Sequence, residues 1–187
     1  MRHVTFVFGG ARSGKSRYAE ALAAKYRGVK TYIATAEAID SEMRARIAKH
    51  REQRGEGWET REVPLYLIES LAAGGSDLVL IDCITVWIGN LMHYGRDVKT
   101  EVARLCEALA QAKARVIVVS NEVGLSIVPE NALARAFRDE QGFANQSIAG
   151  LADEVIFVAA GLPVILKKLR RKPRLKAKAK SSRGRRA

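Results

Sequence analysis

Gly9-Gly10-Ala11-Arg12-Ser13-Gly14-Lys15-Ser16 is the stretch of sequence that decides the fold. It matches the phosphate-loop pattern G-x-x-x-x-G-K-[ST] without a substitution. The apolar run Val4–Phe8 before it predicts a buried strand, and helical spacing of apolar residues from Ser16 to about Tyr26 predicts a helix after it. A strand, a glycine-rich turn and a helix in this order are what a phosphate-binding loop requires.

Each residue type in this loop has a physical reason. Glycine lets the backbone curl so that several N–H groups point at phosphate oxygens, and the helix N-terminus adds a partial positive charge. Lys15 reaches the outer phosphates as the catalytic cation, and Ser16 is a ligand of Mg²⁺. A chance glycine-rich turn is the alternative, and the flanking strand and helix argue against it. The predicted contacts to ATP or GTP are therefore Gly9, Gly10, Ala11, Arg12, Ser13, Gly14, Lys15 and Ser16.

A second magnesium ligand is predicted at Asp82. This acid directly follows the apolar run Leu78–Ile81, which reads as a buried strand. Ligands of open parallel sheets bind outside the carboxyl ends of the strands, where Asp82 would lie. The alternative is that Asp82 caps the helix predicted over Ile84–Tyr94.

Strands and helices alternate along the rest of the chain. Further strands are predicted at Thr31–Ala34, Val116–Ser120, Val155–Ala159 and Leu162–Leu166. Further helices are predicted at Ser41–Arg54, Leu65–Ala73, Lys99–Ala114 and from Glu130 to about Ala152, the last with a break near Gly142. This alternation predicts a single α/β domain whose mostly parallel sheet carries helices on both faces.

The positive charge is concentrated at the C-terminus. The net charge is +12, yet residues 167–187 hold twelve Lys or Arg and no acid, so the remainder is formally neutral. We expect a domain over 1–167 and a basic, disordered tail over 168–187 that could touch an anionic membrane. A nucleic-acid-dependent ATPase that uses this tail is one alternative. The neutral body and the 6% aromatic content argue against a specific nucleic-acid partner.

Cysteine content and hydropathy predict a cytoplasmic protein. Cys83 and Cys106 are too few for a disulfide framework or a four-ligand zinc site. No apolar run has the length of a membrane-spanning helix, and the N-terminus lacks the layout of a signal peptide.

His50 is the histidine that shares a helix face with apolar residues. Met43, Ile47 and His50 follow the i, i+4, i+7 spacing of one face. Spacing alone favours a packed, hydrogen-bonded imidazole. The alternative is a nucleophile, because a neutral imidazole has a lone pair available near pH 7 and could attack the α-phosphorus of a triphosphate.

Four stretches together resemble a known enzyme family. They are GGARSGKSRYAE, YIATAEAIDSEMRARIAKHREQR, LVLIDCIT, and VVSNEVGLSIVPENALARAFRDEQGFANQSIAGLADEVIFVAAGLPV. In this order they are similar to the bifunctional adenosylcobinamide kinase / adenosylcobinamide-phosphate guanylyltransferases of cobalamin assembly. The resemblance extends from about Val4 to Leu166 and is more specific than a phosphate loop, which many unrelated NTPases share.

The resemblance implies two reactions on one corrinoid substrate. The first phosphorylates the aminopropanol hydroxyl of adenosylcobinamide with ATP or GTP. The second transfers GMP from GTP to that phosphate through a guanylyl-histidine, and the R-I-x-x-H motif assigns this histidine to His50. A RecA-like P-loop fold and a homotrimer are also implied. A kinase without the second activity, with a structural His50, is the remaining alternative.

The resemblance implies further nucleotide contacts, and one position departs from it. The implied contacts are Ala34, Thr35 and Ala36, then Arg51, Glu52, Gln53 and Arg54, and Glu62. A carboxylate such as Glu62 suits the N–H groups of guanine because it only accepts hydrogen bonds. Asp82 stands where some members have Glu, so a water could lie between this shorter side chain and Mg²⁺. Asn121 and Glu122 follow a strand end, where they are either substrate contacts or turn residues.

Overall fold

The computed structural model of this protein describes residues 3–37 and 57–169. The predicted helix Ser41–Arg54, including His50, and residues 170–187 lie outside the described residues. The strands are β1 (His3–Gly9), β2 (Lys30–Ala34), β3 (Trp58–Glu62), β4 (Leu78–Asp82), β5 (Arg115–Asn121), β6 (Glu154–Ala159) and β7 (Leu162–Lys168). The helices are α1 (Lys15–Ala23), α3 (Leu67–Ala72), α4 (Ile84–His93), α5 (Val98–Gln111) and α6 (Ala132–Leu151).

One sheet organises the described chain, in the order β3-β2-β4-β5-β1-β6-β7. Every neighbouring pair is parallel except β6 and β7, which form an antiparallel hairpin. β1 therefore lies in the interior of the sheet, with β5 between it and β4. This order brings the phosphate loop after β1 and the acid after β4 to the same edge, two strands apart.

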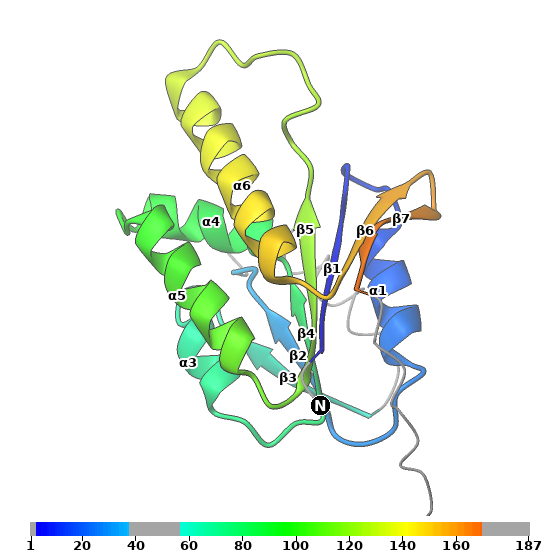
Figure 1. Cartoon of the computed structure of the whole chain (residues 1–187). Helices are drawn as coiled ribbons and strands as arrows, with labels where there is room; N and C mark the ends of the chain where they lie inside the picture. The colour runs from blue at the N-terminus through cyan, green and yellow to red at the C-terminus, as the bar shows by residue number, and fades with distance from the viewer. Residues whose placement is uncertain (1–2, 38–56, 170–187) are drawn as a thin grey trace, which may run out of the picture.

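Helices cover both faces of the sheet (Figure 1). α1 lies on one face, and α3, α4, α5 and α6 lie on the other. Successive side chains of β5 point to opposite faces of the sheet. Val116 and Val118 pack in the core on the side of α3–α6, whereas Ile117 and Val119 pack in the core on the side of α1. The prediction of a mostly parallel sheet with helices on both faces is confirmed.

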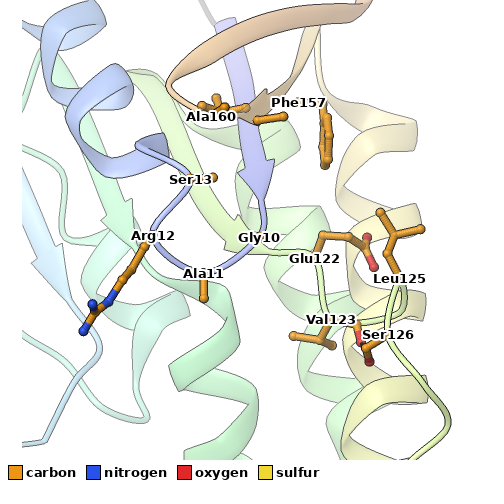
Figure 2. Close-up of a pocket in the computed structure, with 12 residues that line it drawn as sticks. Gly10, Ala11, Arg12, Ser13, Glu122, Val123, Leu125, Ser126, Phe157 and Ala160 are labelled. Atoms are coloured by element: carbon orange, nitrogen blue, oxygen red, sulfur yellow. The ribbon is translucent and has the colours of Figure 1, made fainter.

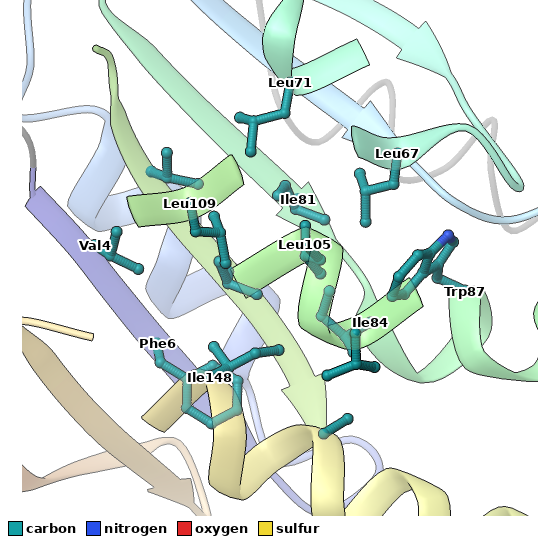
Figure 3. Packing of buried hydrophobic residues seen from close by; sticks show 14 of the residues in the cluster. Val4, Phe6, Leu67, Leu71, Ile81, Ile84, Trp87, Leu105, Leu109 and Ile148 are labelled. Atoms are coloured by element: carbon teal, nitrogen blue, oxygen red, sulfur yellow. The ribbon is translucent and has the colours of Figure 1, made fainter. Parts of the chain in front are cut away.

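The larger core is built from strand side chains and the inner sides of four helices (Figure 3). Val4, Phe6 and Ile81 project from the sheet, and Leu105 and Ile148 reach them from α5 and α6. All five are fully buried. Burial of each such side chain stabilises the fold by about 1.5–3 kcal/mol, so this layer fixes the helices against the strands that carry the site.

Two features differ from the sequence expectation. The edge strand β3 was not predicted, because Trp58–Glu62 has no fully buried residue and, among the described strands, pairs with β2 alone. The predicted break near Gly142 is wrong: α6 is continuous over Ala132–Leu151. A glycine inside a helix costs only about 0.5–1 kcal/mol relative to alanine, which the buried side chains of α6 offset.

The last strand continues past the predicted end of the domain. β7 reaches Lys168, whose Nζ lies 3.2 Å from a carboxylate oxygen of Glu154. The N–H of Leu169 donates to the carbonyl of Asp153 at 2.9 Å. The predicted boundary after residue 167 thus falls inside a strand. Among residues 3–37 and 57–169, no helix is both long and apolar enough to cross a membrane.

Candidate active site

The phosphate loop connects β1 to α1 in a conformation that suits its glycines. Gly14 takes a left-handed φ of 92° immediately before α1, where a side chain would be strained. Arg12 also has a positive φ, of 56°. The Nζ atom of Lys15 folds back to the carbonyl of Gly10 at 3.1 Å, and Lys15 is 9% exposed. The cation is thus held over the loop that would hold phosphate.

The hairpin of β6 and β7 packs directly against this loop. A Cβ atom on Gly9 would overlap the carbonyl oxygen of Val158, and one on Gly14 would lie 3.3 Å from Cα of Gly161. The N–H of Gly161 donates to the carbonyl of Ser13 at 2.8 Å. Glycine is required at position 9 by this close approach as well as by the loop itself.

The predicted magnesium ligand Asp82 lies at the carboxyl edge of the sheet. It ends β4, and its Oδ2 atom accepts a hydrogen bond from the hydroxyl of Tyr32 at 3.0 Å. Ala34 is paired in register with Asp82 on one side and with Glu62 on the other. The sheet therefore places three of the predicted contacts in one row, with Glu62 on the outermost strand.

Cys83 links the row to the phosphate loop electrostatically. Burial and then the negative charge of Asp82 raise the pKa of the Cys83 thiol to about 11. The positive charge of Lys15 has the opposite, smaller effect on the same pKa. The same buried thiol therefore lies in the field of both the loop cation Lys15 and the strand-end acid Asp82. Both charges belong to segments at the carboxyl edge of the sheet, where β1 and β4 end.

Mg²⁺ fits the oxygen atoms at this place. The ion binds proteins through one or two oxygen ligands and completes its shell with phosphate and water. The Ser16 hydroxyl in the first turn of α1 and the Asp82 carboxylate form a donor set of that kind. When bound, Mg²⁺ would neutralise phosphate charge.

Thr35, one of the predicted nucleotide contacts, is buried and forms hydrogen bonds within the protein. Its buried hydroxyl contacts both backbone groups of Cys83, and the amide of Asn90 donates to its carbonyl at 2.9 Å. Ala34 is buried and Ala36 is half-buried. Of the remaining predicted residues, Arg12 and Ala11 are exposed, and His50, Arg51, Glu52, Gln53 and Arg54 lie outside the described residues.

A buried polar cluster under the end of β5 was missed by sequence reasoning. Ser120 donates to Oδ1 of Asn145 at 2.8 Å, and Nε2 of Gln141 contacts both of them at 2.9 Å. Asn145 also donates to the carbonyl of Asn121 at 3.0 Å. The available signal was a pair of amides at i, i+4 on the apolar face of α6, beside Ala144 and Ile148.

Comparisons with known proteins agree with this geometry. Residues 5–166 match the family model described as cobinamide kinase / cobinamide phosphate guanyltransferase. The chain belongs to this family. The bifunctional adenosylcobalamin biosynthesis protein CobP of Pseudomonas aeruginosa is 45% identical over 165 residues, which cover 86% of this chain and 95% of that protein. The protein CobU of Escherichia coli K12, described in the same words, is 42% identical over 178 residues, covering 86% and 98%.

Solved structures agree on the fold alone. The flagellar accessory protein FlaH from Methanocaldococcus jannaschii superposes with a TM-score of 0.50 at 16% identity, covering 89% of this chain and 78% of that one. The RadB recombinase gives the same TM-score and identity, covering 83% and 73%. The family member described here is thus a P-loop protein with RecA-like topology, and its relatives place it among the transferases.

Proposed function

We propose that this chain phosphorylates the aminopropanol hydroxyl of adenosylcobinamide with ATP or GTP, and then transfers GMP from GTP to the new phosphate. The observation that carries the proposal is the family match over residues 5–166, which includes an intact phosphate loop. Lys15 above the loop supports the first reaction, because phosphoryl transfer depends on positioning and charge neutralisation. Ser16 and Asp82 are the proposed ligands of Mg²⁺.

We propose that His50 carries GMP between the two halves of the second reaction. Its imidazole nitrogen bonds to the α-phosphorus of GTP, and the bond from that phosphorus to the bridging oxygen breaks. Pyrophosphate leaves with the electron pair, and corrinoid phosphate then displaces the histidine. The remaining predicted nucleotide contacts at Ala34–Ala36, Arg51–Arg54 and Glu62 are part of this proposal.

Retention of labelled GMP on the denatured protein tests the guanylyl-histidine. Purified protein is incubated with Mg²⁺ and GTP labelled at the α-phosphate, then denatured and counted. We expect label that survives alkali and is lost in acid, as a phosphoramidate requires. His50→Asn should remove it, and His93→Asn, at an exposed histidine of α4, should not. Wild-type protein that phosphorylates cobinamide yet retains no label would leave a kinase with a structural His50.

We further propose a cytoplasmic homotrimer. Free Cys83 and Cys106 are compatible with a reducing compartment. Light scattering coupled to size-exclusion chromatography gives the number of subunits, and a mass near 20.5 kDa would reveal a monomer.

We propose that the basic segment 170–187 is dispensable for both reactions. Truncation after Leu169 keeps β7 and its backbone contact to Asp153. We expect the truncated protein to retain both transferase activities without any stimulation by DNA or RNA. Loss of a nucleic-acid-stimulated ATPase on truncation would instead support the nucleic-acid-dependent alternative.

A further inference from the structure

A cavity of about 650 Å³ opens beside the phosphate loop (Figure 2). The first half of the loop forms one side, and the turn after β5 and the end of β6 form the others. Its lining consists of Gly10, Ala11, Arg12, Ser13, Glu122, Val123, Leu125, Ser126, Phe157, Val158, Ala159 and Ala160. Glu122 is the single carboxylate in this described lining. A group that reacts with a phosphate on the loop could therefore meet an acid here.

The hydroxyl of Ser13 is a second sign that this cavity takes a polar ligand. Ser13 is 9% exposed, and its Oγ atom has no hydrogen-bond partner among residues 3–37 and 57–169. Leaving a buried hydroxyl unpaired costs about 1–3 kcal/mol. The hydroxyl belongs to the phosphate loop and lines the same cavity as Glu122, so a ligand oxygen there would satisfy it.

Glu122 is tied to the first residue of the loop by its own backbone. Its N–H donates to the carbonyl of Gly9 at 3.0 Å. Its Oε1 atom accepts a hydrogen bond from the N–H of Gly124 at 2.6 Å. The second bond holds one carboxylate oxygen at the turn after β5. Glu122 is only half-buried, so the acid can reach a ligand that enters from solvent.

Hydrogen bonds from two helices fix the end of β5, directly before Glu122. The N–H of Asn121 donates to Oγ1 of Thr85 at 2.7 Å, and its carbonyl accepts from Asn145 at 3.0 Å. These contacts come from α4 and α6, which pack on the core under the sheet. A reacting group works best when neighbouring residues fix its position, and the backbone before Glu122 is fixed in this way.

We propose that Glu122 is the general base of the kinase reaction, with Ser13 hydrogen-bonded to the reacting groups; this inference rests on the kinase reaction proposed above. The acceptor hydroxyl oxygen forms a bond to the γ-phosphorus of the nucleotide. The bond from that phosphorus to the oxygen bridging the β-phosphate breaks, and this oxygen leaves with the electron pair. The hydroxyl proton passes to the carboxylate of Glu122. Asp82 is unsuited to this task, because it is the proposed ligand of Mg²⁺.

The apolar part of the lining matches a bulky acceptor. Val123, Leu125 and Phe157 stand beside Glu122 in the same cavity, and Leu125 is 84% exposed. Figure 2 shows Glu122, Val123 and Leu125 on the opposite side of the cavity from Ala11. A large, mostly apolar ligand could therefore place its hydroxyl beside Glu122 and pack its apolar part against Val123, Leu125 and Phe157.

Glu122→Gln tests this base, with Glu130→Gln as the matched control. Both changes remove one carboxylate from the segment between β5 and α6, but Glu130 is exposed and outside the cavity lining. Glutamine keeps an oxygen for the N–H of Gly124. Phosphorylation of adenosylcobinamide is followed with ATP, and each rate is divided by the amount of protein that binds a fluorescent ATP analogue, so misfolded protein does not count.

We expect Glu122→Gln to lower the kinase kcat by about 100-fold or more, the usual scale for loss of a general base. Glu130→Gln should behave as wild type. Label transfer from GTP to protein needs no hydroxyl deprotonation and should be unchanged in Glu122→Gln. Full kinase activity in this variant would overturn the inference. Absence of kinase activity in wild type would instead overturn the proposed function.

Discussion

The hydroxyl of Thr35 forms two hydrogen bonds with one residue, Cys83: it accepts from the Cys83 N–H at 2.9 Å and donates to the Cys83 carbonyl at 2.7 Å. Thr35 is fully buried. The pair of bonds joins the end of β2 to the turn that follows Asp82, and so fixes where this acid lies relative to its neighbouring strand.

Thr35→Val should destabilise the protein while Thr35→Ser should not. Valine keeps the shape but leaves the Cys83 N–H unpaired. The Cys83 carbonyl loses one hydrogen bond and keeps the one from the N–H of Trp87. We expect the free energy of unfolding to fall by about 1–3 kcal/mol. Serine retains the hydroxyl. Urea denaturation measures both variants. Unchanged stability in Thr35→Val together with weaker nucleotide binding would show that Thr35 contacts the nucleotide, as the family resemblance implies.

Lys15→Met should separate catalysis from folding. The Lys15 ammonium contacts the carbonyl of Gly10, and methionine retains a side chain of similar length without the charge. We expect both reactions to fall by about 100-fold or more, as when one preorganised electrostatic contact is removed. Thermal unfolding without nucleotide should be little changed, whereas the rise in Tm on adding Mg²⁺-ATP should shrink. A large loss of Tm in the absence of nucleotide would contradict this separation.

The Cys83 thiol should make stability fall at alkaline pH. Its pKa is about 11 in the native protein, compared with 9.0 for the ordinary group. Below pH 9 the thiol is protonated in both states. Above pH 9 the unfolded chain releases the proton first, so the free energy of unfolding decreases by about 1 kcal/mol at pH 10. Tyrosines also titrate in this pH range, so the free energy of unfolding is measured at pH 8 and pH 10 for both wild type and Cys83→Ala. If it changed equally with pH in the two proteins, the prediction would be refuted.

The cluster under β5 should respond unequally to removal of its two amides. Asn145→Leu removes the acceptor of the Ser120 hydroxyl, which keeps only its contact from Gln141 and a long one to Thr85, and removes the side-chain donor to the carbonyl of Asn121. Gln141→Met removes an amide whose own Oε1 has no partner among the described residues. We expect Asn145→Leu to cost about 2 kcal/mol and Gln141→Met less, since the second change also removes an unsatisfied buried atom. Equal losses in denaturant titration would argue against this assignment.

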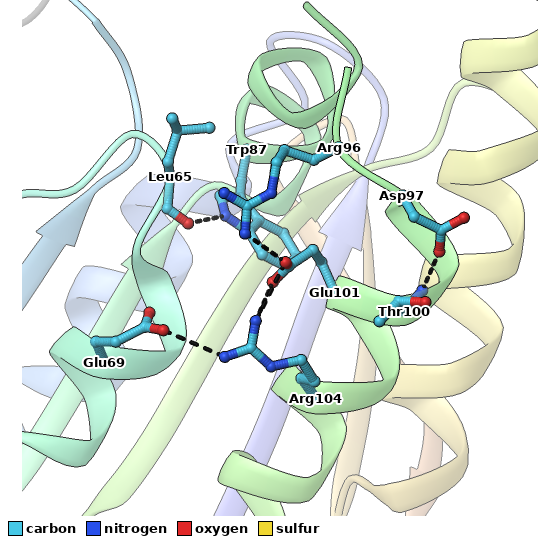
Figure 4. A network of polar contacts seen from close by, with 8 residues as sticks. All are labelled: Leu65, Glu69, Trp87, Arg96, Asp97, Thr100, Glu101 and Arg104. Atoms are coloured by element: carbon cyan, nitrogen blue, oxygen red, sulfur yellow. Dashed lines mark hydrogen bonds and ion pairs between the residues drawn. The ribbon is translucent and has the colours of Figure 1, made fainter. Parts of the chain in front are cut away.

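A buried carboxylate on α5 is the centre of an ion-pair network that reaches α3 (Figure 4). Glu101 accepts hydrogen bonds from Arg96 at 2.8 Å and Arg104 at 3.1 Å, and Arg104 also reaches Glu69 at 3.2 Å. Glu101→Gln should lower the free energy of unfolding by about 1 kcal/mol, because both arginine heads are more than 40% exposed and regain water. The loss should shrink at high salt. The matched control is Glu107→Gln on the same helix.

The sequence predicted the site best where local geometry and chemistry coincide. The phosphate loop needs only the strand before it and the helix after it, so the run from Gly9 to Ser16 was sufficient. Asp82 was placed because an acid after an apolar strand reaches the same sheet edge. The row of Ala34, Asp82 and Glu62 depends on the order of the strands in the sheet. Ala34 and Asp82 are paired although they lie 48 positions apart in the sequence, and no local pattern predicts such a pairing.

Sequence reasoning missed the features whose local residue pattern does not distinguish them from a loop or a solvent-exposed helix face. β3 has one paired side and no fully buried side chain, so its residues carry no strand periodicity that distinguishes them from a loop. Gln141 and Asn145 look like surface amides until the helix is known to face the end of β5. The continuity of α6 through Gly142 depends on tertiary packing, which overrides the low helix propensity of glycine.

The hydrogen bond from Gly161 to Ser13 also bears on how the protein is made. The loop segment leaves the ribosome well before β6 and Gly161, against which it packs, because nearly 150 residues separate Ser13 from Gly161. Contacts so distant along the chain form late. A nascent chain that has not yet released the β6–β7 hairpin therefore lacks a finished phosphate loop, and nucleotide binding becomes possible only after Gly161 has left the ribosome.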